Sequence, residues 1–213
     1  MTADPATRRG RPRNTQADQR ILDAAQALLL TRGYQGLCVA EVARQAAVAK
    51  TTLYRRWPTK DHLAVAVAAQ ILGEVPIPAT GDLPRDLTSF VAALGDGLNR
   101  LRTAGQPDGV ADRSAGPLAD LVAAAGRHPD IGEGVRALYA QRHTMALARL
   151  RHARDHEGLR DDIDLGLLVE QLAAPIYYRI LITGEPVDRA YAQRLVTAVL
   201  DGALAPPTRR DRP

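Results

Sequence analysis

The segment from Val39 to Trp57 combines small, apolar and hydrogen-bonding residues at a spacing that indicates a helix-turn-helix. Counting Val39 as the first position, Ala43 falls at position five, Ala47 at nine and Leu53 at fifteen. A helix-turn-helix needs a small residue where its two helices cross, a small residue in the turn and an apolar anchor in the second helix. Spacing alone leaves open an ordinary short helical hairpin with a polar face.

The second helix of this unit would expose a row of hydrogen-bond donors. A helix in the major groove uses such donors to reach base edges and phosphates. Trp57 lies on the Leu53 side of the helix and is expected in the core, whereas Tyr54 lies on the opposite side. The exposed candidates are Lys50, Thr51, Thr52, Tyr54, Arg55 and Arg56.

The positive charge of the chain is concentrated in its first quarter. The whole chain has a formal net charge of +4, to which residues 1–60 contribute +7 and residues 61–213 contribute −3. A compact basic segment next to a nearly neutral remainder predicts that this segment meets a polyanion, and nucleic acid is the leading candidate.

The N-terminal residues 1–17 have no apolar periodicity and are expected to form a disordered basic arm. The arm has an Arg-Gly-Arg-Pro core within residues 8–13. Such an extended strip is similar to the AT-hook, which lies in a narrow minor groove. A solvated tail is the alternative. The candidate DNA-binding residues of the arm are Arg9, Arg11 and Arg13.

The composition excludes several classes of protein. The 213 residues are 46% apolar and 24% charged, an ordinary balance for a globular protein. Cys38 is the single cysteine, so no disulfide can form within the chain, which suits a reducing cytosol. The longest apolar runs fall well short of the ~20 residues of a membrane span. We therefore expect a cytoplasmic protein with no membrane partner.

The pattern of the chain predicts an all-α fold of about nine helices. Ala and Leu dominate, β-branched alternation is absent and turn signals recur regularly. We expect a helix-turn-helix domain over 18–63, a larger helical domain over 64–205 and a disordered tail over 206–213. The expected helices span 18–32, 39–46, 50–57, 60–73, 84–103, 117–126, 129–157, 164–183 and 187–204.

No constellation of catalytic or metal-binding residues stands out. His152 and His156 stand four residues apart, as two metal ligands on a helix would, but no third ligand is evident and a solvated helix face is favoured. Asp161, Asp162 and Asp164 lie in a turn and are expected to cap the next helix. There is no phosphate loop or nucleophile elbow. We expect no catalytic residues, no metal and no cofactor, and hence no enzyme.

Five stretches resemble the TetR family of bacterial repressors. Gly33-Tyr34, Val39–Ala43 and Lys50–Leu63 are similar to its DNA-binding domain, and the segments 174–179 and 183–186 resemble one branch of the family. The resemblance implies an all-helical homodimer with a small DNA-binding head and a larger body that senses a ligand and dimerises.

The resemblance also implies roles for individual residues of the head. Tyr54 and Lys60 would hold phosphates. Lys50, Thr51 and Thr52 would lie nearest the base edges, and Arg55 or Arg56 would reach a guanine or a phosphate.

The chain departs from the family pattern around the helix-turn-helix. Leu37 and Cys38 replace the usual Thr or Ser that caps the first helix, and cysteine is a poor cap. Ala47 replaces the turn glycine, which is tolerable if its φ stays negative. Ala49 replaces the usual turn serine, which removes a hydroxyl group from the DNA-facing side.

Two apolar helices near the C-terminus are the predicted dimer surface. The first is apolar almost all round and the second has an apolar stripe. Paired with their two-fold copies, they would form a four-helix interface and space two heads on a pseudo-palindrome. Packing within a monomer is the alternative. The predicted interface residues are Ile176, Tyr177, Ile180, Tyr191, Leu195 and Val199.

By analogy with the family, the ligand pocket lies among the helices between residues 84 and 154. Each of the candidate residues could equally be plain core. The candidates are Phe90, Leu94, Leu121, Tyr139 and Met145.

These observations favour a sequence-specific repressor that binds a double-stranded palindromic operator as a homodimer. An unknown small-molecule effector bound in the body would release it. An architectural DNA-binding protein without an inducer is the alternative. An enzyme with an appended DNA-binding head would need convergent polar residues in the body, and the sequence shows none.

Overall fold

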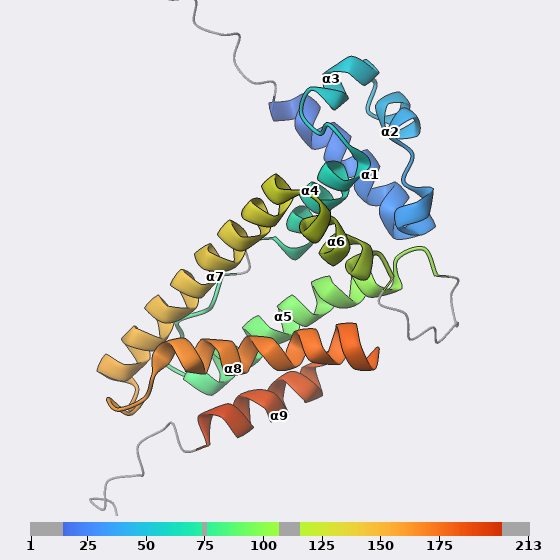
Figure 1. Ribbon diagram of the computed structural model, residues 1–213. Helices are drawn as coiled ribbons and strands as arrows, with labels where there is room; N and C mark the ends of the chain where they lie inside the picture. Colours follow the sequence, from blue (N-terminus) through green and yellow to red (C-terminus); the bar gives the residue numbers. More distant parts are fainter. Residues whose placement is uncertain (1–14, 74–75, 107–115, 202–213) are drawn as a thin grey trace, which may run out of the picture.

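The structure is a computed structural model, and it describes residues 15–73, 76–106 and 116–201 (Figure 1). Within these ranges the chain forms nine α-helices and one π-helical segment, which confirms the all-α prediction. The helices are α1 (Thr15–Gly36), α2 (Val39–Gln45), α3 (Lys50–Tyr54), α4 (Lys60–Leu72), α5 (Leu83–Thr103), α6 (Gly116–Arg127), α7 (Pro129–His156), α8 (Leu165–Tyr177), η1 (Tyr178–Thr183) and α9 (Arg189–Leu200).

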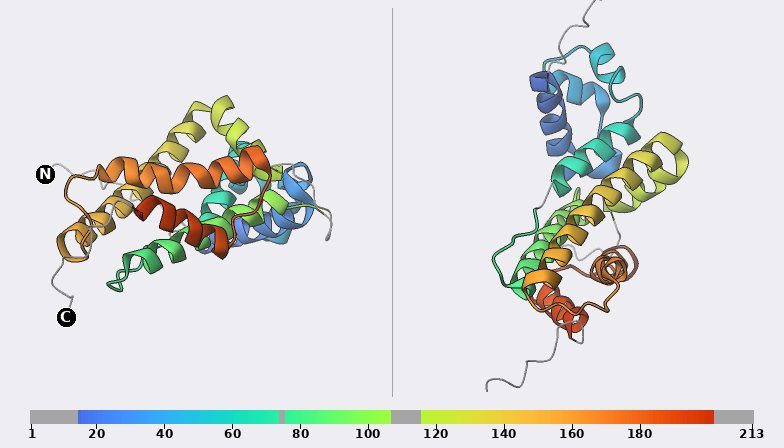
Figure 2. Two further views of the ribbon diagram at one scale, coloured as in Figure 1. Left: turned by 90° about the horizontal axis from the view of Figure 1, so that it is seen from below. Right: turned by 90° about the vertical axis from the view of Figure 1, so that its left-hand side faces the viewer.

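Helices α1, α2 and α3 form a small head at one end of the molecule, and α8 and α9 lie at the opposite end (Figure 2, right). Helix α4 joins the two parts, because it packs against α1 on one side and against α5 and α6 on the other. The domain boundary expected after Leu63 therefore falls inside α4. In the body, α5 packs against α9, and α8 contacts both α7 and α9.

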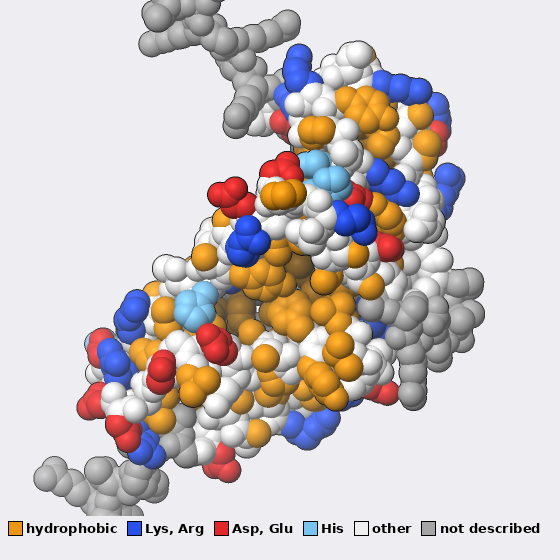
Figure 3. Space-filling model, in the orientation of Figure 1, with side chains coloured by type: hydrophobic (Ala, Val, Ile, Leu, Met, Phe, Trp, Pro, Cys, Tyr) orange, Lys and Arg blue, Asp and Glu red, His pale blue; other side chains and the backbone are white. Residues whose placement is uncertain are grey.

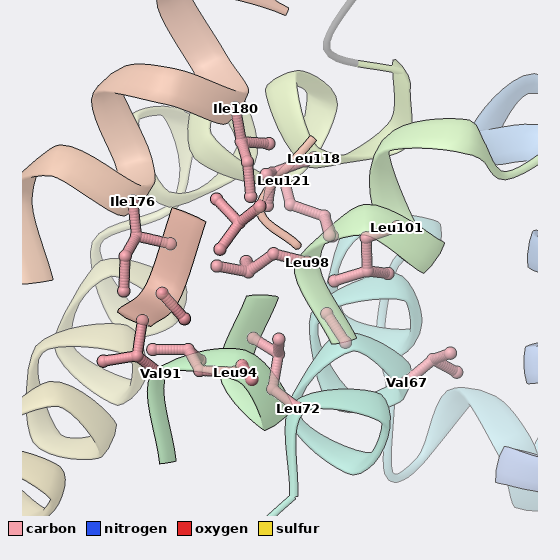
Figure 4. Packing of buried hydrophobic residues seen from close by; sticks show 14 of the residues in the cluster. Val67, Leu72, Val91, Leu94, Leu98, Leu101, Leu118, Leu121, Ile176 and Ile180 are labelled. Carbon is pink, nitrogen blue, oxygen red and sulfur yellow. The ribbon is translucent and has the colours of Figure 1, made fainter. Parts of the chain in front are cut away.

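One hydrophobic core runs from the head into the body through α4 (Figure 4). Leu72 of α4, Leu98 of α5 and Ile180 of η1 are all buried in it. Because this core is shared, a displacement of α4 changes the packing of both parts.

Several helix boundaries differ from those expected, and each difference has a local cause. Helix α3 ends at Tyr54 because the next residues form a tight turn, in which the amide of Arg56 donates to the carbonyl of Leu53 at 3.0 Å. Pro175 lacks an N–H group, and the helix after it widens into the π-helical η1. Helix α8 begins, as expected, after Asp164, whose side chain accepts from the amides of Gly166 and Leu167 at 2.9 and 3.1 Å.

Gly33 has a φ of 66°, and it interrupts α1, which the sequence pattern predicted to end at residue 32. Gly105 follows α5 and approaches this point closely, with its amide donating to the carbonyl of Leu30 at 2.9 Å. A Cβ atom at Gly105 would collide with the backbone of Gly33. These two glycines therefore allow the end of α1 to contact the body.

A buried ion network ties α5 to α7. The Arg149 guanidinium lies 2.8 Å from Asp86 and 2.9 Å from Glu157, and it also donates to the carbonyl of Pro78. Burial opposes ionisation of Asp86, but hydrogen bonds from Arg149 and Thr80 outweigh it and lower the pKa of that carboxyl. The network therefore holds ionised groups inside the body.

Candidate nucleic-acid interface and ligand cavities

Helices α2 and α3 pack as the spacing of the sequence predicts. Ala43, Ala46 and Leu53 are buried between them. In the connecting turn the amide of Val48 donates to the carbonyl of Ala43 at 3.0 Å. The two short helices therefore form a helix-turn-helix held by small and apolar contacts.

Ala47 in this turn has a φ of 53°, the single positive value at a non-glycine residue in the described part of the chain. Alanine is tolerated at this position of the turn when its φ is negative, and that condition is not met. The left-handed conformation brings the Cβ atom too close to the backbone, at a cost of roughly 1–2 kcal/mol. The backbone of the helix-turn-helix is therefore strained at its turn.

The first turns of α2 and α3 have no side-chain caps. Neither Cys38 nor Ala49 makes a capping hydrogen bond, as their residue types predict. At the other end of α2, the Arg20 side chain of α1 donates to the carbonyl of Ala46 at 3.2 Å. This contact was not predicted, because 26 residues separate the two.

Most of the predicted DNA-contacting residues of α3 and the turn after it are exposed on the surface of the head. Lys50, Thr51 and Arg55 are exposed, and Thr52 is half-buried. The Tyr54 side chain is 48% exposed, on the side away from Leu53. Lys and Arg side chains border this end of the molecule in Figure 3. The surface can present donors to a polyanion, as a helix in the major groove does.

Arg56 and Lys60 are held more tightly than the other candidates. Arg56 forms an ion pair with Asp18 of α1. The Lys60 ammonium donates to the carbonyl of Gln35 at 3.1 Å and lies 4.4 Å from the ring centroid of Tyr34. Both cations are therefore fixed against α1 beside the exposed donors. Arg9, Arg11 and Arg13 lie outside the described residues.

Trp57 is half-buried and packs against the core, as predicted from its place on the helix. It also lines a cavity of about 560 Å³ between α4, α6 and α7, which we call the junction cavity. Leu121 and Tyr139 are the predicted pocket residues in its wall. A residue of the head thus forms part of a cavity wall.

A second cavity of about 510 Å³, the body cavity, lies between α5, α7 and α8. Phe90, Leu94 and Tyr139 line it, whereas Met145 lies outside both cavities. Figure 3 shows a hollow walled by hydrophobic side chains in this part of the molecule. Polar and charged residues also line this cavity, and the sequence analysis singled out two of them, Tyr139 and Tyr177. The full polar set is Tyr139, Arg142, His143, Thr144, Glu170 and Tyr177.

A polar cluster around Asp61 connects the head to the body. This carboxylate accepts from the Tyr34 hydroxyl of α1 and from Arg127 at 3.1 Å, and His128 Nε2 lies 2.9 Å from it. Burial opposes ionisation, but these hydrogen bonds lower the pKa of Asp61 overall. Burial and the Asp61 carboxylate raise the pKa of Tyr34 to about 12. We call these four residues the junction cluster.

The predicted dimer surface needs correction at two residues. Ile176 and Ile180 are 1% and 0% exposed in the single chain, so they belong to its core and not to a surface. Tyr177 lines the body cavity, with its ring 5.6 Å from that of Tyr139. Both faces of the helix are apolar, so its pattern could not show which one the body covers.

The outward face of α8 and η1 remains apolar and exposed. Leu167, Tyr178 and Ile182 are 51%, 61% and 71% exposed. Tyr191, Leu195 and Val199 of α9 lie half-buried. The segment Leu165–Thr183 is long and apolar enough to cross a membrane, with 28% of it buried. Because α8 contacts α7 and α9 and η1 contacts α5, this segment packs on one side against the body and leaves its other face open.

His152 and His156 lie on one face of α7 with stacked rings, 4.5 Å between centroids. His156 Nδ1 lies 3.0 Å from the carbonyl of His152, and His152 approaches Glu157 at 3.7 Å. Among the described residues, no group of three His, Cys, Asp or Glu is placed to hold a metal ion.

These features define a helix-turn-helix DNA-binding protein with a helical body. Residues 21–67 match the family model described as bacterial regulatory proteins of the tetR family, and residues 77–199 match the Tetracyclin repressor-like, C-terminal domain. The chain therefore belongs to the TetR family of DNA-binding transcriptional regulators. Regulators of this family typically function as dimers.

Individual relatives agree with this assignment over nearly the whole chain. The HTH-type transcriptional regulator YdeS of Bacillus subtilis is 27% identical over 201 residues, which cover 93% of this chain and 96% of that protein. AqdR of Rhodococcus erythropolis is 27% identical over 91% of this chain and 88% of its own. The crystal structure of the TetR family regulator SCO0332 has a TM-score of 0.63 at 36% identity, covering 90% of this chain and all of that one.

Proposed function

We propose that the protein is a repressor that binds a palindromic operator as a homodimer and is released by a small molecule bound in its body. The observation that carries this proposal is that both cavities adjoin elements that hold α4, which also packs against α1. The junction cavity is walled by Trp57 of the head and by one side of α4, and the body cavity is lined by Arg142, which donates to the carbonyl of Gly73 at the end of α4. A ligand there would contact the elements that position the reading helix, and so its binding free energy would depend on the position of the head.

The dimer surface in this proposal is the exposed face of α8 and η1. Leu167, Tyr178 and Ile182 supply large apolar side chains that a second copy would cover. A two-fold interface built on the same face of both copies fixes the distance between two heads, and a palindrome follows from that symmetry. The proposal places the protein in the bacterial cytoplasm with the chromosome, where it acts by binding alone.

Two experiments test the two halves of the proposal. Selection of bound fragments from random duplex DNA at several salt concentrations would yield a palindromic consensus, with binding that weakens steeply as salt rises. Sedimentation would give the mass of a dimer. Binding to all duplexes alike would contradict the sequence-specific role and support an architectural one.

Two variants serve as controls for each other. Ile182→Glu places a charge on the exposed dimer face, and we expect this variant to sediment as a monomer and to bind the palindrome no more tightly than a single half-site. Tyr54→Glu places the same charge on the reading helix, and we expect it to remain a dimer that no longer binds DNA. A dimeric Ile182→Glu protein would move the interface elsewhere.

A further inference from the structure

We propose that the effector of the body cavity is an apolar organic acid, whose carboxylate binds Arg142. The proposal rests on the function proposed above, since it names the chemical class of the releasing ligand. Arg142 is the arginine that α7 contributes to the otherwise largely apolar wall of this cavity.

The Arg142 guanidinium is only partly satisfied by the protein. One of its terminal nitrogens donates to the carbonyl of Gly73 at 2.9 Å. The other terminal nitrogen is buried and makes no hydrogen bond of good geometry, although the Tyr177 hydroxyl lies beside the guanidinium. Within the described part of the chain, no carboxylate lies within ion-pairing distance of Arg142. A buried charged donor without an acceptor is costly, and an anion is the ligand that would relieve the cost best.

The rest of the cavity fits the remainder of such a molecule. Leu87, Phe90 and Leu94 form an apolar wall opposite α7. The Tyr177 hydroxyl lies beside Tyr139 and Arg142, and burial raises its pKa far above the ordinary value, so it keeps its proton and is placed to donate to an acid bound at Arg142. Glu170 also lines the cavity, but its side chain is exposed and solvated. The volume of about 510 Å³ lies in the range that holds a drug-sized molecule.

The partner of Arg142 in the empty cavity links this site to the head. Gly73 is the C-cap of α4, and its amide donates to the carbonyl of Ala69 at 2.9 Å. Arg142 therefore holds the end of α4 that points away from the DNA. A carboxylate that draws the guanidinium into the cavity competes with this carbonyl. Acid binding then removes one polar contact that holds the C-terminal end of α4, whose Leu72 remains packed in the core, and by linkage DNA that requires a fixed α4 weakens acid binding equally.

The test compares organic acids with uncharged molecules of the same shape. Decanoic, dodecanoic and naphthoic acids, each paired with its primary amide, are titrated calorimetrically into the full-length protein at pH 7, below their micellar concentrations. We expect at least one acid to bind ~10- to 100-fold more tightly than its amide, the ratio that a charge-assisted hydrogen bond supplies. The same acid should release the protein from its selected DNA.

Three variants show whether Arg142 supplies the preference. Arg142→Met keeps the length of the side chain and removes the charge, so acid and amide should bind it alike. Arg142→Lys should restore part of the preference. Arg151→Met removes an exposed arginine of the same helix and should leave the preference intact. Thermal unfolding of each variant shows that it is folded.

The proposal is overturned if no acid binds, if amides bind as tightly as acids, or if Arg142→Met retains the preference. DNA binding is measured separately without any acid. A protein that binds DNA but ignores the acids refutes the ligand class and leaves the regulator intact. A protein that binds the acids through Arg142 but binds no DNA refutes the proposed function and leaves the ligand class intact.

Discussion

Replacing Ala47 by glycine should stabilise the protein, although it removes a methyl group. The alanine occupies the turn between α2 and α3 with a φ of 53°. For a residue with a Cβ atom this conformation costs roughly 1–2 kcal/mol, and glycine adopts it without that cost. Glycine gives back about 0.5–1 kcal/mol, because it gains more backbone freedom in the unfolded chain. The net expectation is an increase of about 0.5–1 kcal/mol in the free energy of unfolding.

This change is best measured by urea unfolding, followed by circular dichroism. A gain of this size in a chain of this length moves the thermal midpoint by only ~1–4 °C, whereas the urea midpoint resolves it clearly. The slope of the transition should stay the same, because the surface exposed on unfolding does not change. The Ala47 side chain is exposed, so no buried contact is lost with the methyl group.

Ala49→Gly is the matched control for this measurement. Ala49 is also exposed and lies two residues further on, but its φ is −68°. Glycine there relieves nothing and should lower the stability by up to about 1 kcal/mol. The two substitutions should therefore shift the urea midpoint in opposite directions. If both lower it, the left-handed conformation of Ala47 is not strained as argued.

Three other perturbations test the DNA-binding surface and the body. Lys60→Ala should weaken binding to every duplex and reduce the salt slope by about 1, whereas Thr51→Ala should relax sequence preference; equal salt slopes for the wild type and Lys60→Ala would remove the phosphate role. Deletion of residues 1–13 should weaken binding chiefly at sites flanked by A·T pairs, and a titration with no loss would identify a solvated tail. The folded pKa of Asp86 is lowered, so its contribution to stability is complete above its unfolded pKa of about 3.9 and disappears as pH falls through the folded value. Asp86→Asn should lower the free energy of unfolding by about 3 kcal/mol at pH 7, because it leaves Arg149 buried with one partner fewer. The variant should also lose less stability than the wild type as the pH falls, and an unchanged pH dependence would count against this role of Asp86.

The sequence was sufficient wherever the controlling interactions are local. The spacing of Ala43, Ala47 and Leu53 predicted the helix-turn-helix, and Asp164 marked the start of α8. A periodic pattern and a capping residue act within one or two turns of helix, so one stretch of sequence contains the whole signal.

The sequence did not predict contacts between residues that are distant along the chain, nor which of two apolar helix faces is buried. Asp61 meets Arg127 and His128 across 66 and 67 residues, and nothing in either segment indicates the other. Ile176 and Ile180 were misplaced because a helix that is apolar all round does not reveal which face the body covers. The strain at Ala47 also escaped prediction, because the surrounding turn decides the sign of φ at this position and the residue type alone does not reveal it.

The contacts of α4 suggest how one helix can transmit a ligand signal without a change in its own structure. Near its N-terminus, Asp61 is held by Tyr34, Arg127 and His128, and its lowered pKa keeps this carboxylate charged at neutral pH. Near its C-terminus, Leu72 packs in the core beside Gly97 of α5, and the polar contact to the body is the bond from Arg142 to the Gly73 carbonyl. The two attachments differ in strength, since several charge-assisted hydrogen bonds at one end outweigh one bond to a neutral carbonyl at the other. A ligand that removes the Arg142 bond leaves the Asp61 contacts in place, so a movement of α4 that repacks Leu72 would pivot about the N-terminal end of α4, beside the recognition helix, and tilt the head without detaching it from the body.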